Sequence, residues 1–72
     1  MDEINRVHQQ DSQLELLRNR INWIYDYRTG ACEYRPPWMD ETVEDRLQDA
    51  HHELTGMYWN PVTATSQVED WK

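Results

Sequence analysis

Residues 14–28 read LELLRNRINWIYDYR, and this stretch decides the predicted fold. Here and upstream, one set of side chains recurs at alternating spacings of three and four, as on one face of an amphipathic helix. Gly30 follows and can take the left-handed conformation that ends a helix. The sequence therefore predicts a helix over about residues 3–28. The face is apolar except at its second and last members and consists of Val7, Gln10, Leu14, Leu17, Ile21, Ile24 and Arg28.

The start of this helix is open between two positions. Asp2 could cap a helix that begins near residue 3, whereas the S-x-x-E pattern of residues 12–15 has the form of a capping box and would start the helix there. We favour the long helix, because Val7 lies on the same face as Leu14 and Ile21.

A second apolar stripe lies on the opposite side of the same helix. Leu16, Trp23 and Tyr27 fall roughly 180° from the first face, with Arg20 at their border. A helix that is apolar on two sides has to be buried on two sides. The C-terminal tail, a second copy of the chain or a foreign partner could cover the stripe, and the first two are favoured. We assign these four residues to self-association and expect a homodimer, because a chain of 72 residues buries a thin core.

The rest of the chain predicts a stiff connector, a second helix and a tail. Pro36-Pro37 favours an extended bend within residues 29–39. A second helix is expected over about residues 40–55, with Asp40 as its N-cap and Gly56 after its end. Its apolar face consists of Val43, Leu47, Ala50, Leu54 and Met57.

The tail, residues 56–72, has no helical period, but it contains several large apolar side chains and should be ordered. These are Tyr58, Trp59, Val62, Val68 and Trp71. The fold class expected is therefore all-α: one small domain over residues 1–72, an antiparallel helical hairpin with an irregular tail, which dimerises into a four-helix arrangement.

The charge distribution limits the kinds of partner that the chain can bind directly. The net charge is −7; residues 1–28 contribute −1 and residues 29–72 contribute −6. Such a chain should not bind nucleic acid directly or attach to anionic membranes, and no apolar run reaches the roughly 18 residues that cross a bilayer. A single cysteine, Cys32, and a polar start at residues 1–3 favour the cytoplasm.

Two groups of residues are candidates for binding a partner protein. Glu41, Asp45, Asp49 and Glu53 follow one another at i+4 spacing, either as a solvated helix face, which is the favoured interpretation, or as a mimic of nucleic acid. The second group is on the connector, where the prolines hold the backbone stiff, and consists of Tyr34, Arg35 and Trp38. Aromatic and arginine side chains carry much of the binding energy of interfaces.

Metal or catalytic chemistry is not expected. Cys32, His8, His51 and His52 are the available thiol and imidazole groups, and they show neither C-x-x-C nor H-x-x-x-H spacing. A nucleophilic pair of Cys32 with a histidine is conceivable, but a chain this small offers little concave surface to a substrate. We expect no cofactor, no metal and no enzymatic activity.

The sequence thus predicts a small acidic protein that binds and modulates, and more specifically inhibits, a larger protein with a basic surface. Its size, acidity and content of four Trp, four Tyr and no Phe are similar to those of phage host-takeover or counter-defence proteins. The alternatives are a homo-oligomeric scaffold subunit and an adaptor.

Overall fold

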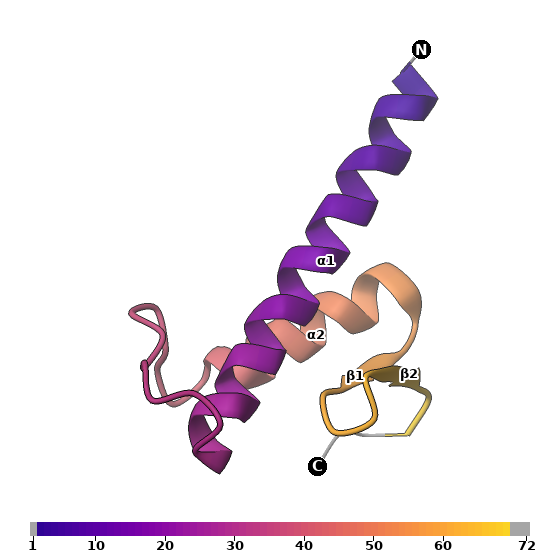
Figure 1. The fold of residues 1–72 in the computed structure, drawn as a ribbon. Coiled ribbons are helices and arrows are strands. Elements are labelled where there is room, and N and C mark those ends of the chain that lie inside the picture. Colours follow the sequence, from indigo (N-terminus) through magenta and orange to yellow (C-terminus); the bar gives the residue numbers. More distant parts are fainter. Residues whose placement is uncertain (1, 70–72) are drawn as a thin grey trace.

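The protein forms two helices followed by a small antiparallel sheet. The structure, a computed structural model, describes residues 2–69, and for residues 2–10 the helical backbone alone. Helix α1 spans Asp2–Thr29 and helix α2 spans Val43–Thr55, while strands β1, Tyr58–Asn60, and β2, Thr65–Gln67, form the sheet. Figure 1 shows α2 beside the C-terminal half of α1, and the first turns of α1 projecting beyond it. No helix in the described part of the chain is both long enough and apolar enough to cross a membrane.

The expectation of an all-α chain with an irregular tail, assembled into a four-helix arrangement, was wrong, although a helical hairpin is compatible with the structure. Strand β1 pairs with β2 so that Trp59 lies opposite Ser66. The turn between them is built by Asn60, whose side-chain oxygen accepts the N–H groups of Val62 at 2.9 Å and Thr63 at 3.4 Å. Ala64 completes the turn with a φ of 54°. Strands of three residues are too short to show an alternating pattern in the sequence.

Local signals set the ends of both helices. Gly30 has a φ of 86° and donates its N–H to the Tyr27 carbonyl at 3.3 Å, which ends α1. Gly56 has a φ of 74° and donates to the His52 carbonyl at 2.7 Å, which ends α2. The start of α2 is three residues later than predicted, because Asp40 does not cap the helix itself. It accepts the N–H of Thr42 at 2.8 Å and so stabilises the turn that precedes α2.

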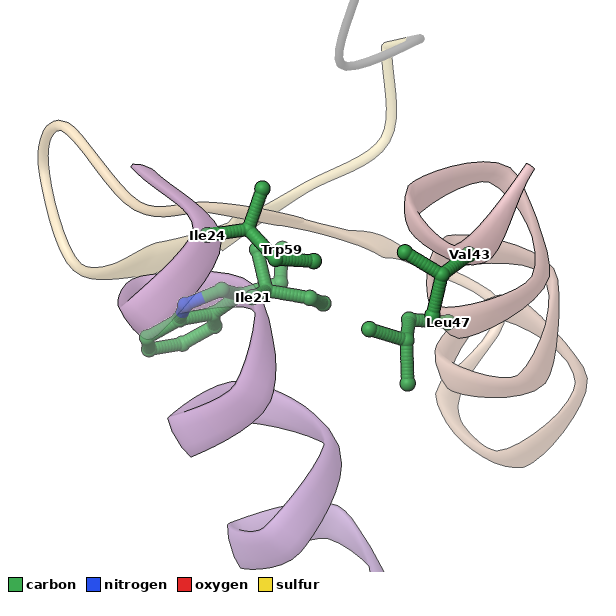
Figure 2. Close-up of a cluster of buried hydrophobic side chains, with 5 residues drawn as sticks. All are labelled: Ile21, Ile24, Val43, Leu47 and Trp59. Atoms are coloured by element: carbon green, nitrogen blue, oxygen red, sulfur yellow. The ribbon is translucent and has the colours of Figure 1, made fainter. Parts of the chain in front are cut away.

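The core lies where α1, α2 and β1 meet. Figure 2 shows Ile21 and Ile24 of α1 facing Val43 and Leu47 of α2, with Trp59 of β1 beside them. Each buried aliphatic side chain contributes roughly 1.5–3 kcal/mol relative to an exposed one. The core is small, and three partly buried side chains extend it: Leu17, Trp38 and Met39.

Two polar side chains of α2, Gln48 and His51, are buried and attach the sheet. The Gln48 amide accepts the N–H of Trp59 at 2.9 Å and donates to its carbonyl at 2.7 Å. His51 Nδ1 lies 2.7 Å from the Met57 carbonyl and must donate to it, so Nε2 is left to accept the Arg18 guanidinium at 3.2 Å. The sheet therefore covers the flank of α2 that carries these polar groups.

The apolar face predicted for α2 is consequently only half buried. Val43 and Leu47 belong to the core, whereas Leu54 is 40% exposed and Met57 is 39% exposed. The physical reason is that the sheet packs on the side of α2 next to the predicted face. The outer end of that face is left open to solvent.

Candidate protein-binding site

The connector folds back onto α1 and forms one aromatic cluster with it. The Trp23 ring lies against Tyr34, with ring centres 6.3 Å apart, and its Nε1 donates to the Tyr34 carbonyl at 2.9 Å. Trp38 meets Trp23 edge to face, with ring centres 5.6 Å apart, and the Arg20 guanidinium lies 5.3 Å from the centre of the Trp38 ring. The sequence assigned Trp23 and Trp38 to two separate surfaces, and the structure places them together.

This cluster changes the account of the second apolar stripe of α1. The connector covers Trp23, and it was not among the three occupants considered from the sequence. Tyr27 is half-buried, whereas Leu16 remains 50% exposed. The stripe is therefore divided between a partly covered portion, Trp23 and Tyr27, and an open portion, Leu16.

The three connector residues predicted to bind a partner differ in their exposure to solvent. Tyr34 is 71% exposed and presents one face of its ring to solvent. Trp38 is half-buried in the cluster. Arg35 is exposed and donates to the Met39 carbonyl at 3.2 Å, so it braces the bend around the buried Pro36. Tyr34 and Arg35 are therefore exposed, and Trp38 is the least accessible of the three.

The acidic residues form a shorter row than the sequence predicted. Asp45, Asp49 and Glu53 lie on α2 at i+4 spacing and are exposed, while Glu41 precedes the helix and does not continue the row. Successive carboxylates rise about 6 Å along the helix axis. The row consists of Asp45, Asp49 and Glu53, and we call it the carboxylate row.

Arg46 on the same helix belongs to a local pair with Asp40. Its guanidinium lies 2.6 Å from the Asp40 carboxylate. The N–H of Thr42 lowers the pKa of Asp40, and the Thr42 hydroxyl and Arg46 act in the same direction. Asp40 therefore stays ionised at neutral pH and holds Arg46 at the start of α2.

A groove follows the interface between α1 and α2. One hollow of about 330 Å³ is apolar at its centre and is lined by Gln13, Leu16, Leu17, Ala50, Glu53 and Leu54. A second hollow of about 280 Å³ shares two of these walls and is lined by Leu17, Arg20, Trp38, Val43, Arg46, Leu47 and Ala50. We call the two together the interhelical groove. The sequence contains one sign of this groove, because Leu16 and Leu54 were each predicted to lie on an apolar helix face.

The candidate chemical groups are engaged elsewhere. Cys32 donates its thiol to the Tyr34 carbonyl at 3.6 Å, and both ring nitrogens of His51 have the partners described above. His52 stacks on Tyr58, with ring centres 4.6 Å apart. His8 lies outside the residues whose side chains are described. Among residues 11–69, no group of three or more His, Cys, Asp or Glu side chains is arranged to hold a metal ion.

Three surface features could contact a partner: the exposed Tyr34 ring on the connector, the carboxylate row and the apolar groove between the two helices. Comparison with known proteins finds no matching family model, no similar curated protein and no similar solved structure.

Proposed function

We propose that this protein binds a larger protein and inhibits it by covering a basic surface that otherwise binds nucleic acid. The carboxylate row on α2 carries the proposal. The axial rise of about 6 Å between its members is similar to the phosphate spacing along a nucleic-acid strand. A basic groove that accepts phosphates can accept such a row.

The charge of the whole chain supports the same partner. The second part of the sequence, residues 29–72, carries a net −6 and includes both α2 and the connector. This field should speed association with a basic surface and make the rate sensitive to salt. Tyr34 lies in the same part of the chain and supplies an exposed aromatic ring for a contact at short range.

The experiment compares two variants of equal charge. Asp45→Asn with Asp49→Asn removes two carboxylates from the row, whereas Asp11→Asn with Glu69→Gln removes two exposed carboxylates elsewhere. A partner is first captured with the wild-type chain and identified by mass spectrometry. Its association rate with each variant is then measured against salt, and its nucleic-acid binding is measured in competition with the chain.

We expect the first double variant to associate more slowly, with a weaker dependence on salt, and to compete poorly with nucleic acid. The second double variant should stay close to wild type. Equal rates for both variants would contradict the role of the row. A captured partner that keeps its full nucleic-acid binding in the presence of excess chain would contradict the proposed inhibition.

A further inference from the structure

The two hollows of the interhelical groove meet at Leu17 and Ala50 and have unlike linings. Leu17 and Ala50 line both of its hollows and so form a common apolar floor. At one end Glu53 stands on the rim, next to the exposed Leu16 and Leu54. At the other end the walls carry two arginines and an indole ring, from Arg20, Arg46 and Trp38.

The basic end is a built feature of an otherwise acidic protein of net charge −7. The Arg20 guanidinium is held 5.3 Å from the centre of the Trp38 ring. The Arg46 guanidinium is held 2.6 Å from the Asp40 carboxylate. Both guanidinium groups are thus held at one end of the groove, where Asp40 balances the charge of Arg46 and the positive charge comes mainly from Arg20, and an occupant meets a carboxylate, Glu53, at the opposite end.

The walls of the groove determine the kind of backbone that fits it. Both walls are helices, and their backbone groups are hydrogen-bonded within each helix. A strand gains no backbone hydrogen bonds from such walls, whereas a helix needs none from them, because its backbone bonds are internal. Gln13 and Arg20 mark the two ends on α1 and lie about 10 Å apart along its axis. Apolar side chains at i, i+4 and i+7 of a helix span the same length.

We propose that the groove binds an amphipathic helix of the partner protein in one orientation. An acidic residue in its first turn lies against Arg20 and Arg46, its apolar side chains cover Leu17 and Ala50, and a lysine or arginine in its last turn lies against Glu53. This order of charges is also the one that stabilises a helix through its dipole. The inference rests on the proposed protein-binding function and names the element of the partner that is recognised.

The probe is a fluorescein-labelled helical peptide with Glu in its first turn, Leu at i, i+4 and i+7, Ala between them and Lys in its last turn. Its binding to the full chain is measured by fluorescence anisotropy, and the site is located by chemical-shift changes of the chain. We expect saturable binding with a Kd below about 1 mM. The largest shifts should occur at Leu16, Ala50 and Leu54.

Two matched pairs of variants test the geometry. Glu53→Lys should weaken binding of the peptide about fivefold, because it turns an attraction into a repulsion. Asp26→Lys makes the same charge change at an exposed position of α1 that lines neither hollow and lies outside the carboxylate row, and it should weaken binding less than about twofold. Leu16→Ser should weaken binding about tenfold through lost apolar contact. Val62→Ser, at a comparably exposed apolar side chain in the β1–β2 turn, should have no effect.

Several outcomes would overturn the inference. The first is no saturable binding by a peptide that circular dichroism shows to be helical. The second is equal effects of Glu53→Lys and Asp26→Lys. The third is chemical-shift changes confined to Tyr34 and its neighbours. A dimer in sedimentation equilibrium that protects Leu16 and Leu54 would assign the groove to a second copy. Chemical-shift changes at these leucines when residues 70–72 are removed would assign the groove to the chain's own C-terminal end.

Failure here can be told apart from failure of the proposed function. The peptide assay uses no native partner, and the capture assay uses variants outside the groove. A groove that binds the peptide while Asp45→Asn with Asp49→Asn leaves partner association unchanged would preserve the groove and refute the carboxylate row. A chain that does not bind the peptide, but associates more slowly with the partner when it carries Asp45→Asn with Asp49→Asn, would preserve the carboxylate row and refute the groove.

Discussion

Replacing Gln48 with leucine should detach the β-sheet from the helices. Gln48 is 1% exposed, and its amide makes both a donated and an accepted hydrogen bond with the backbone of Trp59, at 2.7 and 2.9 Å. Leucine has a similar size but offers neither group. The buried N–H and carbonyl of Trp59 would then lose their bonds to α2.

The expected loss is large for a chain of this size. A buried backbone group left without its hydrogen bond costs roughly 1–3 kcal/mol, so two groups cost about 2–6 kcal/mol. The apolar transfer of the new leucine offsets about 1–2 kcal/mol of this. Taking the middle of each range, about 4 and about 1.5 kcal/mol, we expect a net loss of about 2.5 kcal/mol, against a total stability of about 4–11 kcal/mol for 72 residues.

Urea denaturation followed by tryptophan fluorescence measures this loss, and amide hydrogen exchange at Trp59 locates it. Gln13→Leu is the matched control, because Gln13 is exposed on the rim of the groove. It should leave the free energy of unfolding within about 0.5 kcal/mol of wild type. A Gln48→Leu variant that is as stable as this control would refute the reasoning.

Gln48→Glu separates the two hydrogen bonds. The introduced carboxylate keeps an acceptor for the Trp59 N–H but faces the Trp59 carbonyl with an oxygen in place of the NH2 group. Burial raises the pKa of such a carboxyl, and its protonated form can donate to the carbonyl. The variant should therefore lose stability at neutral pH and regain part of it as the pH falls. A variant with the same pH dependence as wild type would contradict the assigned geometry.

Three further predictions concern the connector, the start of α2 and metals. Trp23→Ala and Trp38→Ala should both destabilise the fold, with a coupling energy of about 1 kcal/mol in a double-mutant cycle because the rings interlock; additive effects in urea denaturation would contradict the cluster. The folded-state pKa of Asp40 lies below its unfolded value, chiefly through the N–H of Thr42, so its contribution to stability is present above the unfolded pKa and disappears as pH falls through the lowered one. Asp40→Asn should remove that acid-side dependence from urea midpoints measured below about pH 5, and an unchanged pH profile would argue against the contact. Treatment with EDTA should leave helicity and the melting temperature unchanged, and a fall of several degrees would show that a metal had been overlooked.

Some of the candidate binding surface could be predicted from the sequence, because its signals are local. Tyr34 was identified from the aromatic and proline content of the connector, and the structure leaves it 71% exposed. The i+4 spacing of acidic residues located the carboxylate row, although Glu41 falls outside it because α2 begins at Val43. The interhelical groove could not be predicted, since its floor and rims come from two helices whose relative rotation is not encoded in either helix alone.

The sequence by itself determined that two helices form and where each one ends, whereas it left the start of the first helix open and placed the start of the second three residues too early. The periodic spacing of Leu14 to Ile24 and the glycines at 30 and 56 act within one or two turns, so they need no distant partner. The charge distribution also follows from the sequence alone, because it depends only on which residues are charged. These properties follow from neighbours along the chain and are visible in the printed sequence.

Tertiary structure alone determined where the tail and the connector pack and which groups the polar side chains of α2 bind. Strand β1 is held by Gln48, eleven residues away, and the Trp59 indole donates to Asn22, thirty-seven residues away, at 3.0 Å. Trp23 is covered by the connector through contacts that span eleven residues. Buried polar groups need hydrogen-bond partners wherever the chain can supply them. Gln48 finds its partner on β1, and His51 is bonded both to Met57, just beyond α2, and to Arg18 of α1, so the full set of bonds is complete only when α1, α2 and β1 have packed together.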